Sequence, residues 1–170
     1  TGHAVLSAKD STHIDANTIL VISGDQPHLS KETISKILEK HQEKNPVITI
    51  GTVLLPDFND WRTGIMNLGR IIRDENGEVV GIREYKDANE EERKITEINP
   101  ALYAFNKEWL WRNIDKLKNE NAQGEFYLTD LVKIAKEQNE KIEAIPVSNI
   151  IEGLQPNSKS ELEELEKLLQ

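Results

Sequence analysis

The sequence contains no cysteine, few aromatic residues and no long hydrophobic run. Without cysteine, the chain can form neither disulfides nor thiolate metal sites. No apolar segment approaches the length that crosses a bilayer, and the first residues lack the basic start and apolar core of a signal peptide. We therefore expect a protein without a membrane partner, and the lack of cysteine fits a cytoplasmic location.

Basic residues are also scarce, with 21 Lys and Arg against 30 Asp and Glu, which gives a net charge of −9. This charge repels nucleic acid and anionic membranes, so we expect no nucleic-acid partner. An anionic substrate would need local help from a divalent cation, a basic side chain or backbone N–H groups. The 170 residues are enough for one domain, 1–170, and too few for two comfortable ones.

The first half of the chain predicts a strand–helix–strand unit. Apolar, β-branched runs at 18–23 and 47–55 are typical of strands buried on both faces. Between them, Ser30 is placed to cap a helix with apolar residues at helical spacing. Such a βαβ unit favours a parallel sheet.

The second half predicts a β-hairpin followed by further α/β elements. Residues 69–73 and 78–84 flank a turn at 74–77, where Asn76-Gly77 offers the positive φ angles of tight hairpins. Other elements are predicted at 2–8 (helix), 87–94 (helix), 96–105 (strand), after Asn106 (helix), 128–139 (helix), 141–147 (strand) and 160–169 (helix). The pattern predicts an α/β fold with a mixed, mostly parallel sheet and a β-hairpin insertion.

Asp25 directly follows the first predicted strand, in Gly24-Asp25. Open α/β sheets bind ligands at the carboxyl ends of their strands, and a carboxylate there suits a hard cation such as Mg²⁺. The same residue also suits an Asx-turn leading into Pro27. Spacing alone leaves both interpretations open.

Glu84 and Asn99 are two further candidates. Glu84 stands at the end of the hairpin's return strand, where it could hold sugar hydroxyls or simply face solvent. Asn99 lies inside a predicted strand, so a buried side chain there needs a partner, which is either backbone or a ligand hydroxyl. The four histidines show no metal-ligand spacing, and the sequence contains no P-loop or dinucleotide-binding fingerprint.

A series of short segments, taken in order, resembles one family. They are 1–5, 23–25, 69–71, 84, 86–88, 97–99, 121–125, 127, 129–130 and 157. The series resembles the uridylyltransferase (pyrophosphorylase) domain of the bifunctional N-acetylglucosamine-1-phosphate uridyltransferase / glucosamine-1-phosphate acetyltransferases. Asn-Ala-Gln-Gly-Glu at 121–125, shortly before Tyr-Leu-Thr-Asp at 127–130, is the most specific part.

The resemblance implies a Rossmann-like nucleotide-diphospho-sugar transferase fold and a specific reaction. UMP would pass from UTP to N-acetylglucosamine 1-phosphate, giving pyrophosphate and UDP-N-acetylglucosamine, a precursor for peptidoglycan. For the metal, the resemblance implies Mg²⁺ bound by Asp25 and Asn157, with Asp25 as the catalytic residue. For the substrates, it implies binding by Thr1, Gly2, Gly69, Glu84 and Asn99.

The sequence also departs from the family pattern. The family's opening strand and glycine-rich phosphate loop would precede Thr1, so we expect the first strands to be missing from this partial domain. Pro100-Ala101 stands where Thr-Gly is usual, and Gln155-Pro156 stands where Gly-Val is usual.

These departures lead to expectations about stability and activity. An unpaired sheet edge would favour marginal stability or a homo-oligomer. We expect the chain alone to be inactive. Two alternatives stay open: a non-catalytic fragment or sugar-phosphate-binding module of the same fold, and a sister sugar-1-phosphate nucleotidyltransferase.

Overall fold

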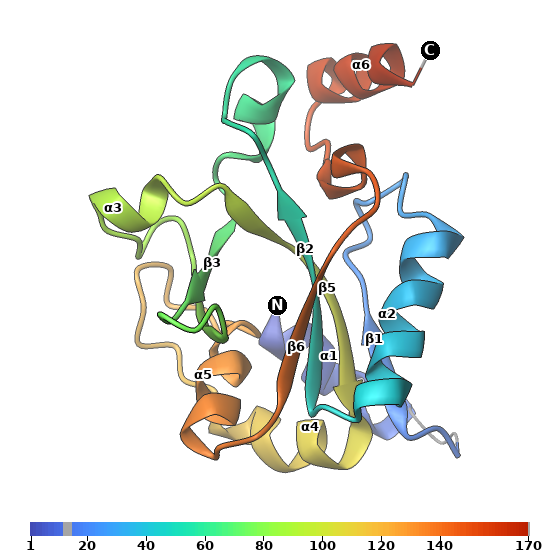
Figure 1. Cartoon of the computed structure of the whole chain (residues 1–170), viewed down its shortest axis with the longest axis vertical. Coiled ribbons are helices and arrows are strands. Elements are labelled where there is room, and N and C mark those ends of the chain that lie inside the picture. The colour runs from blue at the N-terminus through green and yellow to red at the C-terminus, as the bar shows by residue number, and fades with distance from the viewer. Residues whose placement is uncertain (12–14, 170) are drawn as a thin grey trace.

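The computed structural model describes residues 1–11 and 15–169 and has a central six-stranded sheet with helices on both faces (Figure 1). The strands are β1 Thr18–Val21, β2 Ile48–Leu54, β3 Gly69–Arg73, β4 Val79–Arg83, β5 Glu97–Asn106 and β6 Ile142–Pro146. The α-helices are α1 Gly2–Ser7, α2 Lys31–Lys44, α3 Glu90–Arg93, α4 Lys107–Asn113, α5 Asp130–Glu137 and α6 Lys159–Leu168. The 3₁₀ segments are η1 Lys9–Ser11, η2 Asp60–Ile65, η3 Ile114–Lys116 and η4 Ile150–Gly153.

The sheet has the order β4-β3-β5-β2-β6, with β1 paired to β5 beside this path. The α/β class with a mixed sheet is confirmed, but the expectation of mostly parallel pairing is wrong. Among the described strands, only β2 and β6 pair in parallel, because β5 runs against β1, β2 and β3. A strand buried on both faces has the same apolar composition whatever the direction of its neighbours, so the sequence pattern could not reveal this.

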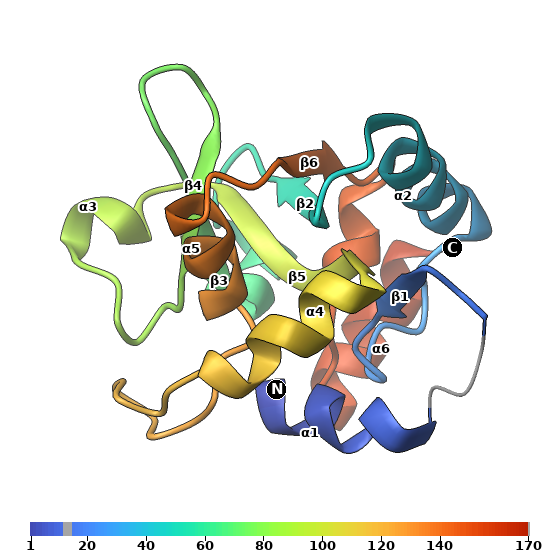
Figure 2. The same ribbon diagram turned by 90° about the horizontal axis from the view of Figure 1, so that it is seen from below.

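Two apolar layers hold the helices against the sheet. On one face, α4 and α5 cover β2 and β5, with Phe105, Trp109 and Leu131 almost fully buried. On the other face, Ile37 of α2 packs against Leu102 of β5. Figure 2 shows α2 and α4 on different sides of the sheet. In the described ranges, no helix combines the length and apolar character of a membrane span.

Local signals start the helices near the predicted positions. The side chain of Ser30 accepts a hydrogen bond from Thr33 N at 3.1 Å, and Asn106 caps α4 in the same way through Trp109 N. The last helix begins one residue earlier than predicted, because Ser158 forms the capping box with Glu161.

The hairpin is confirmed, but its turn differs in detail. Gly77 has a φ of 80°, whereas Asn76 does not adopt a positive φ. The Asp74 carboxylate instead accepts hydrogen bonds from the Asn76 and Glu78 amides, both at 3.0 Å. One left-handed residue and an Asx contact therefore replace the expected pair of positive φ angles.

Candidate functional site

A cavity of about 500 Å³ lies where α1, β1, β5 and the segment before α5 meet. Its described lining residues are Thr1, Ala4, Val5, Ala8, Ile19, Leu20, Val21, Ile22, Ser23, Gly24, Glu84, Asn99, Ala101, Tyr103, Trp111, Leu128 and Thr129. None of these residues is a lysine or arginine, and Glu84 is the one with a charged side chain. The cavity therefore has a polar end near Glu84 and Asn99 and an apolar wall along β1 and α1.

The polar end brings together three residues that the resemblance assigned to the sugar. Gly69 of β3 stands opposite Asn99 of β5 in the sheet register. A Cβ atom at Gly69 would lie 3.0 Å from Ile82 Cγ2 and 3.5 Å from Glu84 Oε2. The absence of a side chain at Gly69 thus lets the Glu84 carboxylate sit against the strand.

Glu84 is held in an environment that favours its protonated form. Its Oε1 accepts a hydrogen bond from the Thr129 hydroxyl at 3.0 Å. Burial raises the pKa of Glu84 above its ordinary value, and the nearby charges of Asp87 and Asp130 raise it further. A carboxyl group that is restrained and partly desolvated in this way is well suited to exchange hydrogen bonds with ligand hydroxyls.

Asn99 is aimed by a bulge in β5. The pairing of β2 with β5 shifts between Gly51 and Val53, so a single residue of β2 faces the stretch 99–101. Ala101 adopts a φ of 61°, and its amide donates to Asn99 Oδ1 at 3.1 Å. This backbone contact accounts for part of the hydrogen-bonding capacity of Asn99, whose side chain also faces the buried hydroxyl of Tyr103.

Arg70 anchors the loop that leads into Gly69. Its buried guanidinium donates to the main-chain oxygens of Met66, at 2.7 Å, and Leu68. The guanidinium carbon also lies 4.6 Å from the ring centre of Phe58 and 5.1 Å from that of Tyr85. One residue next to the candidate site therefore holds the main chain of this loop in place.

Thr1 and Gly2 join the N-terminal helix to the segment before α5. The Thr1 hydroxyl accepts from Leu128 N at 3.2 Å, and Gly2 N donates to Phe126 O at 2.8 Å. A Cβ atom at Gly2 would lie 2.6 Å from Leu117 Cδ1. Thr1 lines the cavity, whereas Gly2 is buried beside it and serves close packing.

Asp25 follows Gly24, which lines the cavity, but Asp25 itself is not among the lining residues. Its Oδ1 is buried and has no hydrogen-bond partner within the described part of the chain, and the same is true of both polar atoms of the Gln26 side chain. Buried polar atoms normally have a partner, so this oxygen is available to a cation or a donor that the chain itself does not supply.

Asn157 lies in the segment before α6 and is exposed. Its Nδ2 donates to Gln155 O at 2.9 Å, and Gln155 Nε2 donates to Pro100 O at 2.8 Å. The segment is therefore attached to β5 next to Asn99, but Asn157 is not among the residues that line the cavity. No group of three or more His, Asp or Glu side chains able to hold a metal occurs among residues 1–11 and 15–169.

Three residues that line the cavity had no role predicted from the sequence. Thr129 belongs to the segment 129–130 of the family series but was given no role, and its hydroxyl donates a hydrogen bond to Glu84 instead of capping α5. Tyr103 OH and Trp111 Nε1 are buried without a hydrogen-bond partner in the described ranges. Both read as ordinary core aromatics in the sequence, because no periodic pattern shows that a polar tip faces a cavity.

Comparison with known proteins identifies the family. A family model described as "Nucleotidyl transferase" matches residues 1–149. The chain belongs to the nucleotidyl transferase family. It is 42% identical over 166 residues to the bifunctional protein GlmU of Bacillus licheniformis and 41% identical over 169 residues to that of Bacillus subtilis. The resemblance seen in the sequence is thereby confirmed.

These relatives are longer than the chain. The matches cover 98% and 99% of this chain but 35% and 36% of the two relatives, so the chain spans about a third of their length.

Solved structures support the same fold at low identity. A putative glucose-1-phosphate thymidylyltransferase from Bacillus anthracis superposes with a TM-score of 0.68 and 16% identity, covering 99% of this chain and 60% of that one. The 4-diphosphocytidyl-2C-methyl-D-erythritol synthase of Anaerococcus prevotii gives a TM-score of 0.61 at 14% identity, covering 99% and 66%. The nucleotidyl transferase chain therefore has the Rossmann-like fold of nucleotide-sugar transferases.

Proposed function

We propose that this protein transfers UMP from UTP to N-acetylglucosamine 1-phosphate, giving UDP-N-acetylglucosamine and pyrophosphate in the cytoplasm. One observation carries the proposal: Glu84 and Asn99 line the polar end of a cavity that Gly24 also lines, and Gly69 lies directly behind them in β3. The family supports a nucleotidyl transfer, and the sugar and base come from the resemblance.

At the sugar end, Glu84 and Asn99 would bind the hydroxyl and amide groups of the N-acetylglucosamine unit. The carboxyl group of Glu84 is held by Thr129, and the side chain of Asn99 lines the same cavity. Fixing the acceptor in one orientation is a large part of catalysis in phosphoryl-type transfers, because no covalent protein intermediate is needed.

At the phosphate end, Asp25 would hold Mg²⁺, with Asn157 as a second ligand. The partnerless Oδ1 of Asp25 fits a hard cation that takes one or two protein oxygens and completes its shell with water and phosphate. Bound Mg²⁺ would neutralise charge between the two anionic substrates. The sugar-phosphate oxygen attacks the α-phosphorus of UTP, a new P–O bond forms, and the bond to the β-phosphate oxygen breaks to release pyrophosphate.

The absence of lysine and arginine from the lining of this cavity favours one other candidate. With no basic side chain among these residues to hold a triphosphate, the chain alone would act as a sugar-phosphate-binding module. The two candidates differ in one measurement, pyrophosphate release by the 170-residue chain with Mg²⁺, UTP and N-acetylglucosamine 1-phosphate. Turnover supports the transferase, whereas saturable sugar-phosphate binding without turnover supports the module.

The site assignment is tested by calorimetric titration with N-acetylglucosamine 1-phosphate. We expect Asn99→Ala to weaken binding by roughly tenfold or more, because one hydrogen bond in a buried site contributes about 1–3 kcal/mol. Asp25→Asn should leave metal-free binding unchanged but remove any enhancement by Mg²⁺. Equal binding by wild type and Asn99→Ala would refute the sugar pocket, and a panel of other sugar 1-phosphates would reveal a sister transferase.

A further inference from the structure

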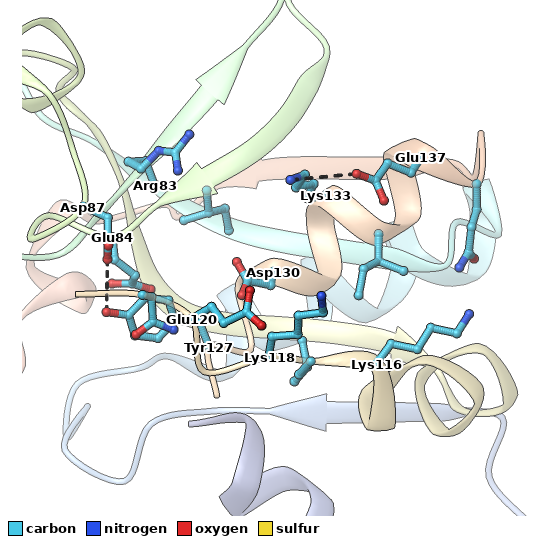
Figure 3. Close-up of a pocket in the computed structure, with 15 residues that line it drawn as sticks. Arg83, Glu84, Asp87, Lys116, Lys118, Glu120, Tyr127, Asp130, Lys133 and Glu137 are labelled. Atoms are coloured by element: carbon cyan, nitrogen blue, oxygen red, sulfur yellow. Dashed lines mark hydrogen bonds and ion pairs between the residues drawn. The ribbon is translucent and has the colours of Figure 1, made fainter. Parts of the chain in front are cut away.

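A second, larger cavity of about 670 Å³ lies on the other side of Glu84 (Figure 3). Its walls come from the end of β4, from the stretch that follows η3 and from α5. Figure 3 shows Lys133 and Glu137 on the α5 side, Lys116 and Lys118 on the opposite side, and Asp130 between them. None of these five residues belongs to the candidate site described above.

The segment 127–130 separates the two cavities. Tyr127 and Asp130 line the larger cavity, whereas Leu128 and Thr129, which lie between them in sequence, line the smaller one. Glu84 borders both. The two spaces are therefore back to back, and residues can be altered in the larger one without touching the smaller one.

One part of the larger cavity offers hydrogen-bond acceptors. The Asp87 carboxylate already accepts from Tyr127 OH at 3.1 Å and Ala122 N at 2.9 Å. Asp130 is half-buried and has no hydrogen-bond partner in the described structure, and burial raises its pKa. Glu120 adds a second carboxylate without such a partner. These acceptors suit a ligand that carries several hydroxyl donors.

The side of the cavity opposite α5 carries two basic side chains, Lys116 and Lys118. Lys116 Nζ donates to the amide oxygen of Asn113 at 2.7 Å and, among residues 1–11 and 15–169, contacts no carboxylate within 4 Å. Lys118 forms no ion pair in the same ranges. Such ammonium groups suit a phosphate.

The apolar lining residues Ile82, Leu117 and Ile134 complete the cavity. A sugar ring has an apolar C–H face as well as hydroxyl edges, so a surface that combines carboxylates with aliphatic side chains matches it. We propose that this cavity is a second binding site, for a phosphorylated polyol whose phosphate lies against Lys116 and Lys118 and whose hydroxyls face Asp130 and Glu120.

The test is a titration followed by amide ¹H–¹⁵N NMR shifts, with glucose 6-phosphate as the probe and with glucose and inorganic phosphate for comparison. We expect saturable shifts in 116–121 and 130–138, with glucose 6-phosphate binding more tightly than either comparison compound. The Lys116→Gln/Lys118→Gln variant should weaken binding by roughly tenfold, the effect of about 1.4 kcal/mol. Lys31→Gln/Lys36→Gln, which changes the same charge on α2, should stay within about twofold, since distant surface charges are screened.

Two further variants separate this inference from the proposed function. Asp130→Asn should weaken glucose 6-phosphate but not inorganic phosphate, whereas Asn99→Ala should leave both unchanged. The proposal is overturned if wild type shows no saturable shift, if the two lysine pairs have equal effects, or if Asn99→Ala abolishes binding. That last result would place the probe in the smaller cavity. Loss of N-acetylglucosamine 1-phosphate binding alone would leave this second site standing.

Discussion

The two ends of the candidate site are built in different ways. At the sugar end, Gly69 and Asn99 are fixed by paired strands, and Glu84 is restrained by a hydrogen bond from Thr129. At the proposed metal end, Asp25 and Asn157 lie outside the helices and strands, and Asp25 Oδ1 has no partner in the described chain. Sheet register can position side chains before a ligand arrives, whereas loop residues depend on the ligand to complete their contacts.

The largest expected effect concerns Arg70, which holds the loop that leads into Gly69. Arg70→Ala removes a buried guanidinium that joins the loop before β3 to the sheet. Leaving buried carbonyls and a cavity behind should lower the free energy of unfolding by roughly 3 kcal/mol or more. Urea denaturation measures this change. Arg112→Ala, on the exposed side of α4, is the control and should change stability by about 0.5 kcal/mol or less; similar losses in both variants would refute the role of Arg70.

The next test compares a glycine at each end. Gly69→Ala places a Cβ 3.0 Å from Ile82 Cγ2 and should cost roughly 1–3 kcal/mol of stability, because a packed core resists added volume. Gly24→Ala meets no atom within 4 Å and should be close to neutral. Thermal unfolding of both variants decides the matter. If Gly24→Ala proves as costly as Gly69→Ala, the loop end is as tightly packed as the sheet end.

A smaller effect concerns the bulge that aims Asn99. Ala101 adopts a left-handed φ of 61°, which costs an L-residue about 1–2 kcal/mol. Ala101→Gly should therefore raise the free energy of unfolding by roughly 1 kcal/mol at most, since glycine also loses more entropy on folding. Ala4→Gly, in the exposed helix α1, should instead lower it by about 1 kcal/mol. Destabilisation by Ala101→Gly in urea titrations would speak against strain at this position.

The smallest effect is the pH dependence contributed by Glu84. Burial raises the pKa of Glu84 in the folded state above 4.5, its ordinary value. At a pH between the unfolded-state pKa and the folded-state pKa, the folded protein therefore binds more protons than the unfolded chain. The contribution of Glu84 to stability therefore falls as pH rises through its folded pKa. Glu84→Gln lacks this titration, so its stability relative to wild type should improve as pH rises from 4 to 8. A constant difference across that range would exclude a raised pKa.

Much of the local structure was predictable from the sequence, because the deciding signals lie within a few residues. Ser30 and Asn106 cap the helices that follow them, and Gly77 closes the hairpin. The partner of each strand was not predictable. The position of β5 between β1 and β2 depends on pairing between residues far apart in the chain.

The candidate site likewise has features that the sequence predicted and features that depend on contacts between distant segments. Family resemblance pointed to Glu84, Asn99 and Asp25, but not to the restraint of Glu84 by Thr129 or to the unpartnered groups of Tyr103 and Trp111. Each of these features depends on contact between two segments that are distant in the sequence. The spacing of apolar residues along the chain does not reveal such contacts.

The sequence by itself determined the chemistry available to this protein: an acidic chain without cysteine, with carboxylates and amides at strand ends and a family pattern along its length. Only the tertiary structure decided which of these groups share a space. It placed Glu84 and Asn99 at one cavity, left Gly69, Asp25 and Asn157 outside its lining, and opened a second, charged cavity behind Glu84. The physical reason is that side-chain identity is local, whereas register, burial and the loss of water around a carboxylate arise only when distant segments pack together.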